Sequence, residues 1–158
     1  MAIPDGPAGT RVTLDLMSRM VKRYKRSVPL RQLALNLIRG IEGRKDFPAQ
    51  VARIRNYVAD NIQYVKDVNG VETVQTPDRT LDNKAGDCDD QSVLVASLLE
   101  TIGHPTRFVA IRMKPLGPFV HVFTQTRIGR QWVTVETTEE WPIGYTPPFA
   151  GKPMIRHN

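Results

Sequence analysis

The feature that most constrains the fold is the run DDQSVLVASLLETIG at residues 89–103. It has the pattern of a helix that is nearly all apolar on its inner side, and Gly103 marks its end. A helix with so much apolar surface has to be covered by other elements. The run therefore predicts a central helix around which the rest of the chain packs.

Three amphipathic helices are predicted before the central one, from apolar residues at helical spacing. They cover residues 13–24, 29–40 and 48–65. Thr13 or Asp15 could cap the first helix, while Pro29 fits the start of the second helix and Gly40 its end. Residues 66–87 hold Asn-Gly, Pro and several Asp or Asn residues, so we expect a long loop there with room for a short strand.

Strands are predicted after the central helix, where β-branched and aromatic residues concentrate. The segments are RFVAIRMK (107–114), FVHVFTQTRI (119–128) and QWVTVETT (131–138). The tail 141–158 is dense in Pro and Gly, and we expect an irregular arm with His157 in a mobile end. Helices followed by strands predict an α+β fold with an antiparallel sheet.

The length of 158 residues fits one domain, and a composition of 41% hydrophobic and 24% charged residues fits a globular protein. A lone cysteine, Cys88, cannot form an internal disulfide and excludes Cys-rich zinc sites. Residues 1–10 lack the pattern of a secretory signal, and no apolar run is long enough for a membrane span. We expect a cytoplasmic protein.

A basic run, RMVKRYKR at residues 19–26, stands out in a chain of net charge +6. Its cations are Arg19, Lys22, Arg23, Lys25 and Arg26. Clustered cations can bind the phosphates of nucleic acids. A solvated helix face is the more common origin of such a run, and no recognised nucleic-acid-binding pattern accompanies it. We therefore expect a solvated surface, with nucleic-acid binding as the alternative.

The single cysteine lies where a thiol could be activated. If Asp87 caps the central helix, Cys88 falls in the first turn, where free N–H groups and the helix dipole favour a thiolate. The carboxylates of Asp87, Asp89 and Asp90 oppose that ionisation, so a cationic histidine would be needed. The alternative is a small buried thiol in the core, which the polar neighbours disfavour.

His121 and Glu136 are predicted to lie on one face of neighbouring strands. A turn at residues 128–129 places them directly opposite each other, and a turn at 129–130 makes them diagonal neighbours. Either register leaves them about 4.5 to 8 Å apart. Together with Cys88 they could supply a nucleophile, a base and an orienting acid. The alternatives are a core histidine and a solvent-facing glutamate.

The string GDCDDQSVLVASLLETIGHPTRFVAI, followed by HVF and WVTVETT, resembles the core of the transglutaminase-like superfamily of papain-like cysteine enzymes. The resemblance covers about residues 54–140, between N-terminal helices at 10–47 and the arm at 141–158. It implies that Cys88 is the nucleophile, His121 the base and Glu136 the third member, where the superfamily usually has aspartate. The later TTEEWPIGYTPP is similar to segments of small phage and prophage members.

The resemblance implies acyl transfer to and from a Cys88 thioester, with a protein or peptide substrate and no cofactor or metal. Gln75 or Tyr64 could assist an oxyanion hole, and Asp87 could play an auxiliary role. Hydrolysis by a peptidase or amidase is preferred over cross-linking, because little chain lies outside the core to bind an amine donor.

The alternative from a different class is a non-catalytic phage-type structural or assembly protein that retains the fold. It would contact other phage proteins through the basic helix and the tail. Such a protein would be found in the host cytoplasm or incorporated in a virion.

Overall fold

The computed structural model describes residues 6–41, 45–66 and 73–158. The helices are α1 (Gly6–Tyr24), α2 (Val28–Leu37), α3 (Phe47–Asn61), α4 (Pro77–Asn83) and α5 (Cys88–Thr101). The strands are β1 (Gln63–Tyr64), β2 (Ala85–Gly86), β3 (Thr106–Arg112), β4 (Phe119–Ile128), β5 (Gln131–Val135) and β6 (Ala150–His157). None of the described helices is long and apolar enough to cross a membrane.

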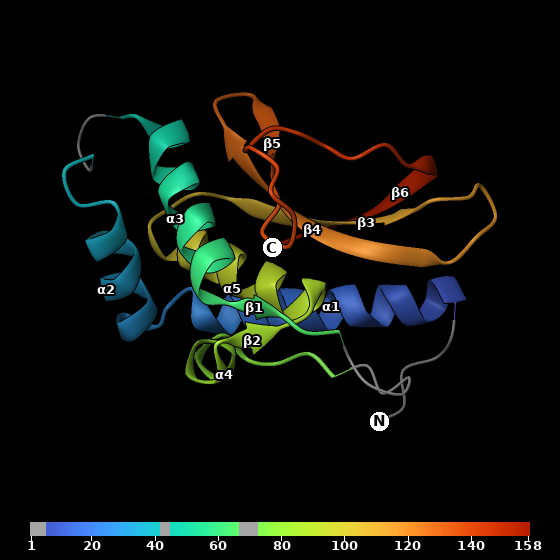
Figure 1. Cartoon of the computed structure of the whole chain (residues 1–158), viewed down its shortest axis with the longest axis horizontal. Helices are drawn as coiled ribbons and strands as arrows, with labels where there is room; N and C mark the ends of the chain where they lie inside the picture. The colour runs from blue at the N-terminus through green and yellow to red at the C-terminus, as the bar shows by residue number, and fades with distance from the viewer. Residues whose placement is uncertain (1–5, 42–44, 67–72) are drawn as a thin grey trace.

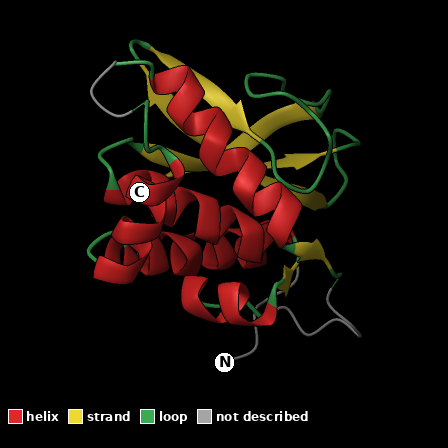
Figure 2. Ribbon diagram, turned by 60° about the vertical axis from the view of Figure 1, so that its left-hand side comes forward, coloured by secondary structure: helices red, strands yellow, loops and turns green. Residues whose placement is uncertain are grey.

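The helices lie on one side of a four-stranded antiparallel sheet of order β5-β4-β3-β6, and α4 is separated from the sheet by α5 (Figures 1 and 2). β1 and β2 form a separate parallel pair next to the N-terminal end of α5. The predicted α+β class with an antiparallel sheet is therefore confirmed.

The predicted central helix is α5, in which every residue from Asp90 to Leu99 is buried. Its two sides contribute to two apolar cores. One core, with α2 and α3, includes Leu30, Ala34, Val51, Ile54, Val58, Leu94 and Leu98. The other, with α1 and the sheet, includes Leu14, Met17, Val21, Val93, Ala96, Phe108 and Val122. Because both cores share α5, the position of its N-terminal end is fixed from two directions.

The first helix is longer than predicted, because α1 begins at Gly6. The hydroxyl of Thr13 donates to the carbonyl of Gly9 inside the helix at 3.1 Å. The carboxylate of Asp15 pairs with Arg156 at 3.1 Å. The predicted capping role of these two residues is therefore wrong, since both lie within the helix.

Part of the predicted loop at 66–87 is a helix, α4, which the sequence reasoning missed. α4 has only seven residues, too few for a hydrophobic period to emerge, and it buries Pro77 and Thr80. The short strand expected there is β2. Residues 67–72 of the predicted loop lie outside the described residues.

The predicted irregular C-terminal arm is wrong for its last part, because residues 150–157 form β6 and pair with β3. His157 therefore lies in a strand, with its ring 5.3 Å from that of Trp132. Gly151 and Pro153 obscured the strand pattern in the sequence. Both residues are tolerated here because β6 is at the edge of the sheet.

Candidate active site

The N-terminal end of α5 is held by a reciprocal pair of hydrogen bonds. Asp87 is the N-cap, and its carboxylate accepts from the backbone N–H of Asp90 at 3.0 Å. The carboxylate of Asp90 accepts from the backbone N–H of Asp87 at 3.1 Å, which completes a capping box. Cys88 is the first residue of the helix and is partly exposed. The predicted position of the thiol, in the first helical turn, is confirmed.

Asp90 is buried, and its carboxylate also binds the segment that precedes α4. Its carboxylate also accepts from the backbone N–H of Gln75 at 2.7 Å and from Nε2 of the same residue at 2.9 Å. Gly86 lies so close that a Cβ at this position would be 2.7 Å from Cβ of Asp90. The Gly-Asp-Cys-Asp-Asp string thus places a glycine where nothing larger fits and a buried carboxylate that fixes the start of α5.

His121 and Glu136 are joined by a hydrogen bond. Ile128 pairs with Gln131, so the turn is at residues 129–130 and the two side chains are diagonal neighbours. Nε2 of His121 lies 2.5 Å from Oε2 of Glu136. This bond occupies one ring nitrogen and leaves Nδ1 as the atom that can exchange a proton with a thiol.

The side chain of Glu136 is only 2% exposed, and residues of its own loop donate hydrogen bonds to its carboxylate. Oε1 accepts from the backbone N–H groups of Thr137 and Thr138, each at 3.0 Å, and from Oγ1 of Thr138 at 2.8 Å. Burial raises the pKa of Glu136, but the hydrogen bond and charge of His121 and the bonds from Thr138 outweigh it, so the net pKa is lowered. Glu136 is thus a carboxylate that can orient His121 and stabilise its protonated form.

The first turns of α5 are fastened to β4 beside His121. Oγ of Ser92 donates to the carbonyl of Val122 at 3.3 Å, and Oγ1 of Thr124 donates to the carbonyl of Ser92 at 3.1 Å. The backbone N–H of Val122, the residue after His121, is close enough to the sulfur of Cys88 to lower the pKa of the thiol. The start of α5 is therefore held against β4 close to the position of His121 in the strand.

The surroundings of Cys88 favour the neutral thiol. Its pKa is raised well above the ordinary value, chiefly by burial, then by the Asp89 carboxylate and to a lesser extent by Asp87 and Glu136. The Val122 N–H opposes this shift. Oδ1 of Asp89 lies 3.7 Å from the sulfur and accepts from the thiol. A base is therefore required to activate Cys88 near neutral pH.

A family model described as the transglutaminase-like superfamily matches residues 31–137. The chain belongs to this superfamily. The match starts earlier than the resemblance noted from residue 54, so α2 and α3 are part of the transglutaminase-like region as well. A search of curated proteins found no match to this chain.

Two solved structures share the transglutaminase-like fold. A proposed cysteine protease from Cytophaga hutchinsonii has a TM-score of 0.58 at 23% identity, over 87% of this chain and 46% of that one. A proposed protease from Parabacteroides distasonis has a TM-score of 0.62 at 16% identity, over 82% of this chain and 27% of that one. This chain thus spans less than half the length of either protein.

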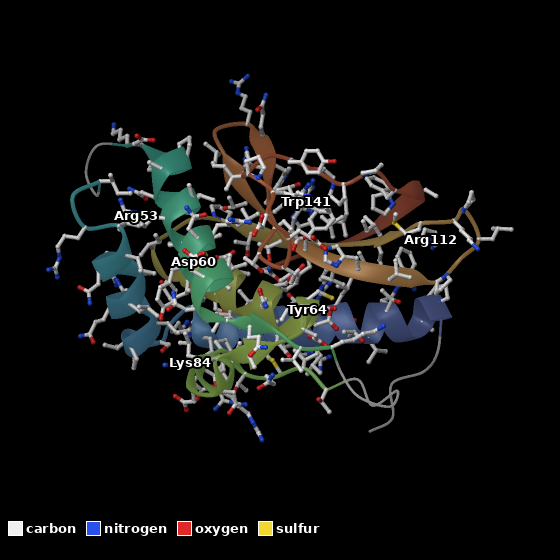
Figure 3. The ribbon with its side chains drawn as sticks, in the orientation of Figure 1. Arg53, Asp60, Tyr64, Lys84, Arg112 and Trp141 are labelled. Atoms are coloured by element: carbon white, nitrogen blue, oxygen red, sulfur yellow. The ribbon has the colours of Figure 1, made fainter. Side chains whose placement is uncertain are left out.

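Tyr64 (Figure 3) lies within electrostatic reach of Cys88 in this transglutaminase-like site. It pairs with Gly86 in the β1–β2 ladder, and its side chain is about half exposed. Burial raises the pKa of Tyr64, and the charges of Cys88 and of the neighbouring carboxylates raise it further. Its hydroxyl is therefore a proton donor at neutral pH within electrostatic reach of the sulfur.

Gln75, the other residue considered for an oxyanion hole, is engaged in the support of α5. Its Nε2 donates to the carbonyl of Ala85 at 3.2 Å and to Asp90 at 2.9 Å. Its Oε1 accepts from Nδ2 of Asn83 at 2.8 Å. With both amide hydrogens used, Gln75 links α4 and β2 to the capping box.

The basic run of residues 19–26 and the histidine that follows Gly103 lie elsewhere. The basic run covers the end of α1 and the turn after it: Arg19, Lys22 and Arg23 on the helix and Arg26 in the turn are exposed, and Lys25 in the turn is half-buried. His104 is buried, and its Nε2 lies 2.9 Å from Oε1 of Gln50. Within the described residues, no group of three or more His, Cys, Asp or Glu side chains is placed to hold a metal ion.

The sequence reasoning missed Arg55, which holds the loop that carries Glu136. Its guanidinium donates to the backbone carbonyls of Glu136 at 2.7 Å and of Glu139 at 2.5 Å. These acceptors lie 81 and 84 residues further along the chain, and a backbone carbonyl has no signature in the sequence. No pattern could therefore have found this contact.

Replacing Asp89 with asparagine should speed the alkylation of Cys88. The carboxylate raises the pKa of the thiol, so its removal increases the thiolate fraction by more than it reduces the nucleophilicity of the thiolate. We expect the rate with iodoacetamide at pH 7 to rise about three- to tenfold. Asp60→Asn, an exposed change on α3 (Figure 3), is the control. Equal rates in Asp89→Asn and the parent would contradict this account of the thiol.

Proposed function

We propose that this chain is a thiol-dependent acyl-transfer enzyme that hydrolyses an amide or ester bond of a protein or peptide through a thioester on Cys88. The observation that carries the proposal is the hydrogen bond between Nε2 of His121 and the buried carboxylate of Glu136. His121 immediately precedes Val122, whose backbone N–H lowers the pKa of the Cys88 thiol. This arrangement supplies a nucleophile, a base and an orienting acid.

In the first step, the sulfur of Cys88 attacks the carbonyl carbon while its proton passes to Nδ1 of His121. Glu136 stabilises the imidazolium that results. When the tetrahedral intermediate collapses, the carbon–nitrogen or carbon–oxygen bond breaks, and His121 returns the proton to the leaving group. The product is a thioester on Cys88 with a neutral imidazole beside it.

The negative oxygen of the intermediate needs hydrogen-bond donors. The backbone N–H groups of the first turn of α5 point towards this end of the helix. The hydroxyl of Tyr64 is a further donor candidate, since it remains protonated at neutral pH within electrostatic reach of the thiol. We assign the side-chain part of this role to Tyr64 rather than to Gln75, whose amide hydrogens are already bonded.

In the second step, a water molecule attacks the thioester carbon and transfers a proton to His121. The carbon–sulfur bond then breaks, His121 returns the proton to the sulfur of Cys88, and the carboxylic acid leaves. An amine in place of water would give a cross-linked product by the same route. We favour water over an amine as the acceptor, which makes the proposed reaction a hydrolysis. In the non-catalytic alternative, a phage-type structural protein, the same fold would carry an unreactive thiol.

Trapping the thioester tests this proposal. The protein incubated with p-nitrophenyl acetate at pH 7 should gain one acetyl group on Cys88, detected by mass spectrometry. It should then lose the group with time, and faster when an alkyl amine is added if amines are accepted. Cys88→Ser controls for acetylation of lysines. A Cys88 that stays unmodified while surface lysines react would support the non-catalytic alternative.

A further inference from the structure

Glu136 lies just beyond the sheet that places His121. The β4–β5 ladder ends at the pair Thr124–Val135, so the ladder does not fix the backbone of residue 136. The bonds from Thr137 and Thr138 to the carboxylate come from the same loop, and they move with it. A contact from outside this loop is therefore needed to fix the backbone of Glu136 relative to His121.

Arg55 of α3 provides that hold. Nε donates to the carbonyl of Glu136 at 2.7 Å, and Nη2 donates to the carbonyl of Glu139 at 2.5 Å. Its third nitrogen, Nη1, donates to Oδ1 of Asn56 at 3.1 Å, which fixes the guanidinium against its own helix. The planar guanidinium thus binds both ends of the loop that contains the Glu136 carboxylate.

The helix that carries Arg55 is itself fixed to the thiol side of the site. α3 ends next to β1, whose Tyr64 pairs with Gly86, two residues before Cys88. Nε2 of the buried Gln91 on α5 donates to the carbonyls of Ile62 and Gly86, each at 3.4 Å. α3 therefore connects the loop of Glu136 to the N-terminal end of α5 (Figure 1).

We infer that Arg55 is a positioning residue, which acts on the Cys88 thiol through Glu136 and His121 by holding the 136–139 loop against α3. The inference rests on the proposed function. Without the guanidinium of Arg55, the carboxylate of Glu136 can move away from the imidazole of His121. A displacement of about 1 Å in such a group can lower the rate by up to about a hundredfold. A lysine has a single ammonium and cannot bridge both carbonyls in the same way.

A double-mutant cycle tests the inference, with the rate of Cys88 alkylation by iodoacetamide at pH 7 as the readout. Arg55→Met should slow the reaction about tenfold, and Arg55→Lys should slow it less. In a Glu136→Gln background, the further effect of Arg55→Met should fall to less than about twofold. Equal slowing in both backgrounds, or none in the parent, would overturn the inference.

Arg53→Met is the matched control, because Arg53 lies on the same helix (Figure 3) and also donates to a backbone carbonyl, that of Leu37 at 3.2 Å. It should leave the rate unchanged, and a slowing equal to that of Arg55→Met would count against positioning. All rates are compared at a temperature where thermal melts show each variant to be folded.

Hydrogen exchange separates this inference from the proposed function. If Glu136→Gln alone leaves the alkylation rate unchanged, the proposed triad fails. The amides of Thr137 and Thr138 then report on the loop directly, because they donate to Glu136. Faster exchange of both amides in Arg55→Met, but not in Arg53→Met, would still show that Arg55 positions the loop. If the exchange of these two amides is unchanged in Arg55→Met, Arg55 does not position the loop.

Discussion

Replacing His121 with alanine should slow the alkylation of Cys88 at pH 7 by about a hundredfold or more. Burial and nearby carboxylates hold the pKa of the thiol well above its ordinary value, so the parent protein depends on a base to generate the thiolate. The side chain of His121 is 22% exposed and pairs with the buried carboxylate of Glu136, so its truncation should also lower the Tm. Rates are therefore compared at a temperature where the variant is folded. Rates with iodoacetamide across pH measure the effect, and the variant should react appreciably only at high pH.

Changes at Glu136 separate orientation from proton transfer. Glu136→Gln should reduce the rate less than His121→Ala, because the amide keeps the base but stabilises the imidazolium less and no longer fixes its tautomer. Glu136→Asp should be milder still, since it restores the usual superfamily residue with a shorter reach. If Glu136→Gln reacts as fast as the parent while His121→Ala is inert, Glu139 or Glu140 is the next acid to test. If His121→Ala reacts like the parent, no triad exists and the thiol is structural.

The central helix and the position of its cysteine were predictable because both follow from local chemistry. An apolar run of this length has to be buried, and α5 is buried from Asp90 to Leu99. An aspartate before a helix-forming run is a capping signal, and Asp87 forms the expected bond. These features depend on residues that are near neighbours in the chain.

The pairing of His121 with Glu136 was only partly predictable. Alternation placed both on one face, and left two registers that differ in the position of the turn. The structure has the turn at residues 129–130, with Gly129 at a φ of +63°, which suits a glycine. A glycine at the first central position is the local signal of a type II′ turn, so turn chemistry favours this register where alternation alone leaves both open.

Elements that depend on distant partners escaped prediction. The strand β6 exists because β3 has a free edge for it, and its own residues include Gly151 and Pro153. α4 is stabilised by packing rather than by its length. Arg55 binds carbonyl groups, which every residue has. In each case the information lies in the tertiary arrangement rather than in local composition.

Replacing Gly86 with alanine should lower the free energy of unfolding by about 3 kcal/mol, which for a domain of this size lowers the Tm by roughly 6 to 12 °C. The new Cβ would lie 2.7 Å from Cβ of Asp90 and 3.1 Å from its Oδ2. Asp90 is 1% exposed and accepts from Gln75 and Asp87, so it cannot move without leaving a buried carboxylate short of donors. Thermal and urea unfolding measure the loss.

The same substitution should also slow the alkylation of Cys88 in the folded protein, because Asp90 and Asp87 define where α5 begins. Gly40→Ala is the control: Gly40 has a φ of +91° and no atom within 4 Å of a new Cβ, so backbone strain alone should cost about 1 kcal/mol there. It should leave the thiol rate unchanged. If Gly86→Ala costs no more than this control and keeps the parent rate, residue 86 has room for a side chain, and the glycine before the capping aspartate does not set the position of the thiol.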